Sequence, residues 1–297
     1  MSDLSAASTE SPNLRGISGR TKVCAVIGDP VEHSLSPAIH NAAFKALGID
    51  YVYVAFRVPR DQLNTAIAGI KSLGLAGVNV TMPHKTRVLR SLDTVNRIAR
   101  EIGAVNTIVR DGSRLRGYNT DGDAALSTLM SLGGSLAGTT AVIFGAGGAA
   151  RSIAYHTSKV VKNLAILNRT RSKASNIAAK VTTWSGTKCR PHNLNRASLR
   201  TQASRADLII NTLPVDVFPP FGRMLIQEKL IRPGMLVFDL NYHRNRDFLS
   251  EAQQAGAKVT DGLDMLVTQA ALSFRLWTGK EPPIDVMRQS AIQARGT

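Results

Sequence analysis

The chain has 297 residues, of which 43% are hydrophobic and 20% charged, so it is expected to fold as a globular protein with one large domain or two smaller ones. It lacks an apolar run of about eighteen residues, which argues against a membrane span. Lysine and arginine number 37 against 21 acidic residues, and the resulting formal charge of +16 favours anionic partners.

Nucleic acid is disfavoured as that partner, because the cations are scattered along predicted helix faces and aromatic residues make up only 5% of the chain. Cys24 and Cys189 form neither a disulfide framework nor a CxxC motif, so a cytoplasmic protein is expected. The six histidines lack ligand spacing and are interpreted as surface or loop residues, and no metal site is predicted.

Alternating strand-like and helix-like segments make up the first part of the chain. Residues 1–20 are polar, lack the apolar core of a secretory signal, and are predicted to be a flexible tail. Strands are then expected at 21–28, 51–58, 76–82 and 105–109, and helices at 37–47, 60–74, 85–92 and 96–103. A turn follows at Asp111 and Gly112. This order predicts a mostly parallel sheet covered by helices.

A second α/β series follows, beginning with a helix at 121–132. Strands are expected at 139–145, 163–167, 207–213, 235–240 and 257–260, with a helix at 148–161 after the first of them. A long helix at 262–279 and a last helix from Pro283 precede no strand, so they are expected to return to the first domain. The predicted limits are therefore 21–120 and 121–261 for the two domains and 262–297 for the C-terminal helices.

Two serines flank a leucine in the stretch GDPVEHSLSP, residues 28–37. Ser36 is predicted to cap the following helix, with Pro37 at its first position. In an extended segment, Ser34 would point to the same side as Ser36, and two hydroxyls beside free helix amides suit a carboxylate or phosphate. A simple cap with one solvated serine is the alternative for this stretch alone.

The sequence GAGGAA, residues 145–150, follows an apolar strand and begins a helix, as the dinucleotide-binding fingerprint requires. Gly145 would allow the tight turn and Gly147 the approach of a pyrophosphate, while Ala150 would pack closely on the sheet. An enzyme that binds NAD usually has an acidic residue about twenty positions later. Here that place reads LNRTRSK, residues 167–173, whose cations favour the 2′-phosphate of NADP over a plain basic surface loop.

Further motifs are NVTMPHK at 79–85, GAVNT at 103–107, NTDG at 119–122 and DGLDMLVTQA at 261–270. Together with HSLSP and the glycine-rich fingerprint, they closely resemble the shikimate dehydrogenase family, the shikimate/quinate 5-dehydrogenases, from residue 23 to about 288. The resemblance implies a two-domain α/β enzyme with an N-terminal substrate domain and a Rossmann-type doubly wound NADP-binding domain. It also implies reversible, NADP-dependent reduction of 3-dehydroshikimate to shikimate in the shikimate pathway of aromatic amino acid biosynthesis, with the substrate in the cleft between the domains.

Site residues are carried over from the matching motifs. The resemblance implies that the substrate is bound by Ser34, Ser36, Asn79, Thr81, Asn106, Tyr242 and Gln269. For the cofactor, the fingerprint and the LNRTRSK segment predict binding by Gly145, Ala146, Gly147, Gly148, Ala149, Asn168, Arg169, Thr170 and Lys173, with Arg171 as a further cation. The resemblance adds Gly262 and Met265, which match residues that line the nicotinamide pocket. For Gln269, a polar residue of the helix core is the alternative.

Lys85 and Asp121 match the catalytic pair of the family. Hydride transfer from a secondary alcohol needs a group that removes the hydroxyl proton. A lysine with its ordinary pKa of about 10.4 is a poor base at neutral pH. A helix start behind Pro83 and a desolvated cleft would lower the pKa of Lys85, whereas an ionised Asp121 would raise it, and the sequence leaves the balance open.

Two segments of the cofactor domain depart from the family pattern, namely HRNRDF after Tyr242 and NTLPVD from Asn211. Within the family, quinate is an alternative substrate, but quinate-using members often replace the second serine, so Ser36 favours shikimate. A non-catalytic NADP-binding or nucleic-acid-binding protein is a more distant alternative, against which Lys85 and Asp121 argue. The sequence leaves the oligomeric state undetermined, and a homodimer is possible.

Overall fold

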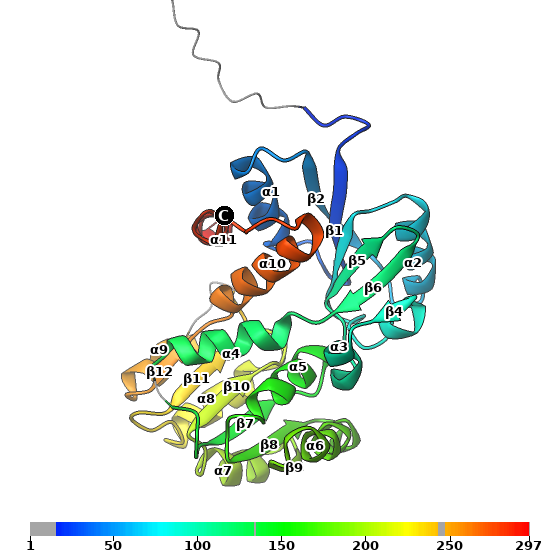
Figure 1. Cartoon of the computed structure of the whole chain (residues 1–297). Helices are drawn as coiled ribbons and strands as arrows, with labels where there is room; N and C mark the ends of the chain where they lie inside the picture. The colour runs from blue at the N-terminus through cyan, green and yellow to red at the C-terminus, as the bar shows by residue number, and fades with distance from the viewer. Residues whose placement is uncertain (1–15, 134, 243–246, 297) are drawn as a thin grey trace, which may run out of the picture.

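The computed structural model describes residues 16–133, 135–242 and 247–296. Most of the predicted tail, residues 1–15, lies outside this range, as do residues 243–246 of the divergent HRNRDF segment. Two six-stranded sheets, each flanked by helices, form the upper and lower halves of the molecule in Figure 1.

The first sheet has the strand order β2-β1-β3-β5-β6-β4. Its strands are β1 (Lys22–Gly28), β2 (Tyr51–Arg57), β3 (Gly77–Val80), β4 (Thr94–Val95), β5 (Thr107–Asp111) and β6 (Arg114–Tyr118). β1 pairs in parallel with β2 and β3, and β4 with β6, whereas β5 runs antiparallel to β3 and β6. The sheet is thus mixed, because the turn expected at Asp111 and Gly112 is the tip of a β5–β6 hairpin.

Helices cover both faces of this sheet. They are α1 (Ser36–Ala46), α2 (Leu63–Ser72), the 3₁₀ turn η1 (Val88–Ser91) and α3 (Arg97–Ile102). Alternate residues of β1 point to opposite faces, so Cys24 and Val26 pack towards α1 while Ala25 and Ile27 pack towards α2. The helix predicted at 85–92 is wrong in type and start, since only the short 3₁₀ turn forms there.

The cap predicted at Ser36 is also wrong. The helix begins at Ser36 itself with Leu35 at the N-cap position, and the Ser34 hydroxyl accepts the Ser36 N–H at 3.3 Å. Because Ser36 lies on the inner face of the first turn, its side chain is buried and is not turned back to cap the helix. Ser34 supplies the local bond that was assigned to Ser36.

The second sheet is entirely parallel, with the strand order β12-β11-β10-β7-β8-β9. Its strands are β7 (Thr140–Phe144), β8 (Asn163–Asn168), β9 (Lys188–Asn193), β10 (Leu208–Asn211), β11 (Leu236–Asp239) and β12 (Lys258–Thr260). In chain order this is the 3-2-1-4-5-6 pattern of the Rossmann fold. The direction of winding reverses between β7 and β10, where such sheets bind ligands at their carboxyl ends.

Three helices lie on each face of the second sheet. They are α4 (Asp121–Ser131), α5 (Gly148–Thr157) and α6 (Arg171–Ser185) on one face, and α7 (Arg196–Ala203), α8 (Pro219–Gln227) and α9 (Asp247–Gln254) on the other. The predicted start of α4 at Asp121 is confirmed. Strand β9 was missed, because KCRPHN is polar and contains a proline, which only an edge strand tolerates.

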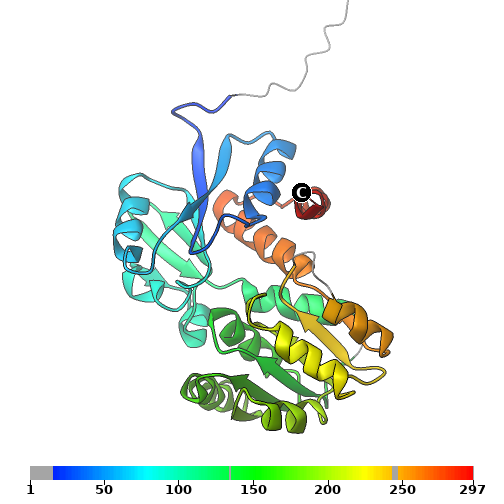
Figure 2. The same ribbon diagram turned by 180° about the vertical axis from the view of Figure 1, so that it is seen from behind.

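The last two helices return to the first sheet, as predicted (Figures 1 and 2). Helix α10 (Leu263–Thr278) packs against α4 at one end and reaches the first sheet at the other, where the Trp277 indole donates to the Ile108 carbonyl at 2.9 Å. Helix α11 (Ile284–Gly296) packs on α1. Nowhere in the described ranges is a helix both long and apolar enough to cross a bilayer.

Candidate active site

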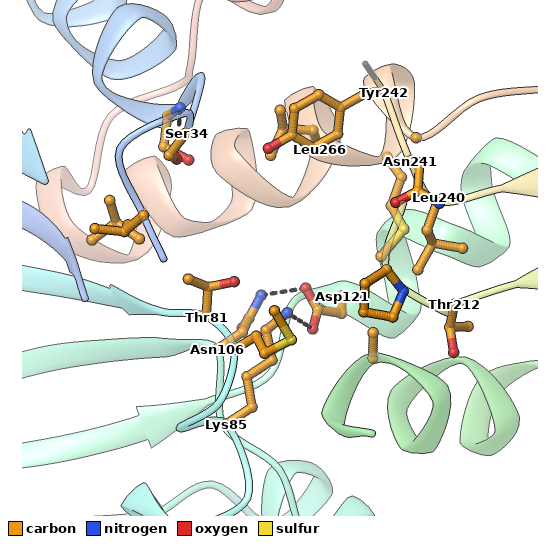
Figure 3. A pocket seen from close by; sticks show the side chains of 18 of the residues that line it. Ser34, Thr81, Lys85, Asn106, Asp121, Thr212, Leu240, Asn241, Tyr242 and Leu266 are labelled. Carbon is orange, nitrogen blue, oxygen red and sulfur yellow. Dashed lines mark hydrogen bonds and ion pairs between the residues drawn. The ribbon is translucent and has the colours of Figure 1, made fainter. Parts of the chain in front are cut away.

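A pocket of about 450 Å³ opens between the two sheets, at the carboxyl ends of β7, β10 and β11 (Figure 3). All residues predicted for the substrate and for catalysis line it, as do three of those predicted for the cofactor, Ala149, Gly262 and Met265. Segments far apart in the chain meet here. The loop before α1, the turn after β3, the start of α4 and the middle of α10 each contribute a wall.

Lys85 and Asp121 are in direct contact at the floor of the pocket. The Lys85 ammonium lies 2.6 Å from the Asp121 carboxylate, and the two side chains are 18% and 4% exposed. Lys85 sits in the turn before η1, where its carbonyl accepts the Val105 N–H at 2.8 Å. It is therefore not at a helix start, and the expectation that a helix dipole acts on it from its own segment is wrong.

Asn106 fixes the orientation of the Asp121 carboxylate. Its side-chain amide donates to the second Asp121 oxygen at 2.8 Å (Figure 3). The same amide donates to the Thr120 hydroxyl, also at 2.8 Å. The Asn106 side-chain oxygen in turn accepts the Thr120 N–H at 2.8 Å. Both Asp121 oxygens are thus occupied, one by a cation and one by an amide, and the carboxylate cannot turn without breaking a bond.

Asn79 joins the pocket to a buried network beneath it. Its amide donates to the Ser273 hydroxyl at 3.1 Å and its oxygen accepts the Tyr53 phenol at 2.7 Å. Burial raises the pKa of Tyr53 well above its ordinary value, and a hydrogen bond with Ser36 opposes that shift. Tyr53 therefore remains a donor and connects Asn79 to the serine wall.

Three histidines contradict the prediction of surface positions. His40, His84 and His156 are buried. The His40 ring stacks on Tyr53 with centroids 4.4 Å apart, and burial lowers its pKa to about 3, so it is a neutral packing residue. His40 and His156 lie where the apolar spacing of α1 and α5 would place core residues, which the sequence interpretation did not take into account, whereas His84 lies in the turn after β3.

The serine pair faces the pocket from the loop before α1. Ser34 is partly exposed and lies across the opening from Tyr242 (Figure 3). Ser36 is 5% exposed and sits deeper, beside the first turn of α1. His33, which the prediction omitted, also lines the opening. Thr81, at the end of β3, completes this hydroxyl-lined wall.

The glycine-rich turn has the geometry of a phosphate cradle. Gly145 has a φ of +107°, and a Cβ there would lie 2.3 Å from the Thr212 hydroxyl. A Cβ on Gly147 would meet nothing within 4 Å, so space for an approaching group is open above it. Ala150 is 1% exposed in the core under α5. The helix amides that begin at Gly148 face this space with their positive end.

The residues predicted to read the 2′-phosphate lie at the end of β8, beyond the pocket lining. Asn168 donates to the Thr170 carbonyl at 2.9 Å and thereby shapes the turn into α6. Arg169, Arg171 and Lys173 are exposed around that turn. Burial lowers the pKa of the neighbouring His192, and the charges of Arg171 and Arg190 lower it further. The surface there is positive and accessible to an anion.

The remaining wall combines the start of α10 with the loops after β10 and β11. Gly262 lies so close to the backbone that a Cβ would be 1.9 Å from the Leu240 carbonyl oxygen. Gln269 is 8% exposed and donates to the Leu266 carbonyl at 3.0 Å, while its side-chain oxygen lies 3.4 Å from the Asn106 amide. Gln269 thus contributes both to the helix and to the pocket.

A partly buried polar network at this wall was not predicted. One Asp239 oxygen accepts the Asn211 amide at 2.8 Å and both the backbone and side-chain N–H groups of Asn241 at 3.0 and 2.9 Å. Asn241 also donates to the Leu213 carbonyl at 3.1 Å. The network ties the loops after β10 and β11 together. Only the polar ends of the two apolar strands could have indicated it.

Further lining residues were missed, and most of them are apolar or lie in the divergent NTLPVD segment. They are Val26, Pro30, Val31, Val80, Met82, Thr212, Leu213, Pro214, Val215, Asp216, Leu240, Asn241 and Leu266. No group of three or more His, Cys, Asp or Glu side chains suited to a metal ion occurs in the part of the chain that the structure describes.

The Rossmann sheet with its open glycine cradle, together with a Lys–Asp pair that joins the turn after β3 to the start of α4, defines the class: a two-domain, dinucleotide-dependent oxidoreductase. Family models match most of the chain. The shikimate dehydrogenase substrate binding domain matches residues 26–108, shikimate / quinate 5-dehydrogenase matches 127–245, and the shikimate 5′-dehydrogenase C-terminal domain matches 262–292.

Individual relatives agree with these models. Shikimate dehydrogenase (NADP(+)) of Moorella thermoacetica is 41% identical over 282 residues, covering 94% of this chain and 96% of its own. A crystal structure of a shikimate dehydrogenase in complex with NADP+ has a TM-score of 0.83 at 39% identity, covering 94% of this chain and 97% of its own. The enzyme from Listeria monocytogenes, in complex with shikimate and NAD, has a TM-score of 0.83 at 33% identity, with 94% and 99% covered. The chain belongs to the shikimate dehydrogenase family, and the predicted family and fold class are confirmed.

Proposed function

We propose that this protein is an NADP-dependent shikimate dehydrogenase, which reversibly reduces 3-dehydroshikimate to shikimate. The observation that carries the proposal is the Lys85–Asp121 contact at 2.6 Å, on the floor of a pocket whose walls bear hydroxyl and amide groups. A polyhydroxylated ring acid needs such a pocket, with donors and acceptors around it and one group able to exchange a proton.

The substrate carboxylate is assigned to the serine wall. Ser34 and Ser36 can each donate a hydroxyl hydrogen to a carboxylate, and Tyr242 lies across the opening from Ser34 (Figure 3). Asn79, Thr81, Asn106 and Gln269 offer amides and a hydroxyl to the ring hydroxyls. The carboxylate would thereby fix one end of the ring while the reacting carbon lies over Lys85.

Lys85 is assigned the proton transfer. In the direction of reduction, its ammonium donates a proton to the carbonyl oxygen while the carbonyl carbon receives the hydride, and the carbonyl becomes a secondary alcohol. In the reverse direction, the neutral amine accepts the hydroxyl proton. Asp121, itself held by Asn106, keeps the Lys85 side chain directed at that oxygen.

The residues present fit NADP. The open space above Gly147 admits a pyrophosphate, the first turn of α5 offers amides to it, and Arg169, Arg171 and Lys173 lie exposed where the 2′-phosphate would be. When bound, the cofactor supplies the hydride chemistry. Gly262 and Met265 would form the wall against its nicotinamide ring.

The location, oligomeric state and domain limits are also proposed. A cytoplasmic location agrees with the free thiols of Cys24 and Cys189. The limits 21–120, 121–261 and 262–297 agree with the start of α4 at Asp121 and of α10 at Leu263. A homodimer is the proposed oligomeric state, and light scattering of the purified protein tests it.

The decisive experiment is a steady-state assay that crosses shikimate and quinate with NADP⁺ and NAD⁺. We expect the highest kcat/KM for shikimate with NADP⁺, because both serines are present and the β8–α6 turn is basic. Higher kcat/KM with quinate would identify a quinate dehydrogenase instead. Absence of nicotinamide reduction with all four pairs would refute the proposed function.

A further inference from the structure

The C-terminal helix contributes no described residue to the pocket lining, yet it is attached to the pocket wall by a largely buried ion pair. Arg295, near the end of α11, donates to one oxygen of Asp261 at 2.7 Å, and the two side chains are 18% and 15% exposed. The model of the C-terminal domain of the family matches residues 262–292, so Arg295 lies beyond the residues that this model matches.

Asp261 controls the turn that begins α10. Its other carboxylate oxygen accepts the Leu263 N–H at 3.0 Å, which fixes the first turn of the helix. Gly262, the next residue, lies against the Leu240 carbonyl with no room for a side chain, so the turn and the loop after β11 are packed backbone to backbone. A displacement of Asp261 would therefore move Gly262, Met265 and the loop that carries Tyr242 together.

Arg295 also supplies a positive charge where the carboxylates of Asp239 and Asp261 lie near each other. Asp239 and Asp261 stand at adjacent strand ends, and the pKa of Asp239 is raised, chiefly by burial and further by the charge of Asp261. Two carboxylates so placed repel one another, and Arg295 offsets the charge of one of them. The Asp239 network that joins the loops after β10 and β11 is thus kept in place in part from the C-terminus.

Helix α11 extends this link to the opposite wall. It packs along α1, where the Ser290 hydroxyl donates to the Ala38 carbonyl at 3.0 Å, two residues after Ser36. A second pair, Arg288 with Asp264, joins α11 to the first turn of α10. One helix therefore spans from the start of α1, on the serine side, to the start of α10, on the side proposed for the nicotinamide.

We propose that Arg295 is a positioning residue for hydride transfer, which acts through Asp261 to hold the 261–265 turn at the position where the nicotinamide ring meets the substrate. This proposal rests on the proposed function, because the ring and its substrate are assigned by it. Arg295 touches neither, and its effect is on the geometry of the wall.

The test compares Arg295→Ala, Arg295→Lys and Asp261→Asn with the wild type in the full chain. We expect Arg295→Ala to lower kcat by about ten- to a hundredfold, the usual effect of a misplacement of about 1 Å, with the KM for shikimate within about twofold of wild type. Calorimetry should show weaker NADP⁺ binding, and hydrogen exchange at the 262–266 amides should accelerate. Arg295→Lys should restore most of kcat, since it restores the charge.

The control is Arg275→Ala, which removes an exposed ion pair with Glu281 at the other end of α10 and should leave these quantities unchanged. If Arg295→Ala does not fold, Asp261→Asn tests the proposal in its place. This variant weakens the pair with Arg295, but its remaining side-chain oxygen can still accept the Leu263 N–H. Wild-type kcat, NADP⁺ affinity and exchange in a folded variant would overturn the proposal, and so would failure of Arg295→Lys to recover any of them. A wild type that binds NADP⁺ but does not oxidise shikimate would refute the proposed function, while binding and exchange would still test Arg295.

Discussion

At the scale of single residues, Lys85 depends on neighbours from distant parts of the chain. Asp121 begins α4, Asn106 precedes β5, and both are needed to hold the ammonium at 2.6 Å from the carboxylate. The contact is largely closed to solvent, so it is stronger than a surface ion pair and its orientation is better defined.

Replacing Lys85 by alanine should therefore remove proton transfer without removing binding. We expect kcat to fall by roughly 10²- to 10⁴-fold, the usual contribution of a general acid or base, while NADP⁺ and shikimate still bind in calorimetry. Lys71→Ala is the matched control, since Lys71 also pairs with an aspartate, Asp93, at 3.0 Å but lies away from the pocket. A folded Lys85→Ala variant with near-normal turnover would exclude the assigned role.

The residues predicted for the substrate and for catalysis do line the pocket, but the sequence did not predict what each one does locally. Ser34 and Ser36 both line the pocket as expected, yet the helix-start bond comes from Ser34, because the helix begins one residue earlier than the proline suggests. Asp239 was not anticipated at all. Its partners, Asn211 and Asn241, come from two strand ends, and only the folded sheet brings them together.

At the scale of elements, the local sequence pattern predicted the apolar strands and the amphipathic helices, but it missed strands that are very short or polar. Strand β4 has only two residues, and β9 is polar with an internal proline, so neither has the alternation that identifies a strand. Both form because a neighbouring strand offers backbone hydrogen bonds, β6 to the first and β8 to the second. Whether such segments form strands depends on pairing with a neighbouring strand in the folded sheet, which the sequence pattern does not contain.

The β8–α6 turn leads to a prediction about cofactor choice. Arg169 is exposed beside Arg171 and Lys173, and a 2′-phosphate there would receive charge-assisted hydrogen bonds. We expect Arg169→Ala to weaken NADP⁺ binding by about 1.5 to 3 kcal/mol, or ten- to a hundredfold, and to leave NAD⁺ nearly unaffected. The measurement is kcat/KM with both cofactors.

Parallel losses for the two cofactors in Arg169→Ala would mean that the arginine supports the fold and does not read the phosphate. Since Arg171 and Lys173 can partly replace it, a small effect in the single variant should be followed by the triple variant. A wild type that prefers NAD⁺ would contradict the interpretation of this turn directly.

At the scale of the whole molecule, the two halves are in close contact at the pocket, where the turn that carries Lys85 meets the first turn of α5. A Cβ built on Gly148, in the first turn of α5, would lie 2.6 Å from the Cβ of Lys85, below any normal contact. A glycine at position 148 is therefore needed for the aliphatic part of the Lys85 side chain to lie against the first turn of α5. The neighbouring Gly147 has no such contact and faces open space. Two adjacent glycines of one motif are thus required for different reasons.

Alanine substitutions should separate these two roles. Gly148→Ala should displace Lys85 and lower kcat by about tenfold or more, with a smaller effect on NADP⁺ binding. Gly147→Ala should leave the free protein undisturbed and weaken NADP⁺ binding, because its methyl group would occupy the space of the pyrophosphate.

Gly69→Ala is the control, since a Cβ within α2 at that position meets nothing within 4 Å and should stabilise the helix by about 0.5 to 1 kcal/mol. Calorimetry with NADP⁺, steady-state kinetics and thermal unfolding of the three variants distinguish the cases. Equal effects of Gly147→Ala and Gly148→Ala on kcat and on NADP⁺ affinity would show that Gly148 serves the cofactor alone and that the contact with Lys85 has no part in turnover.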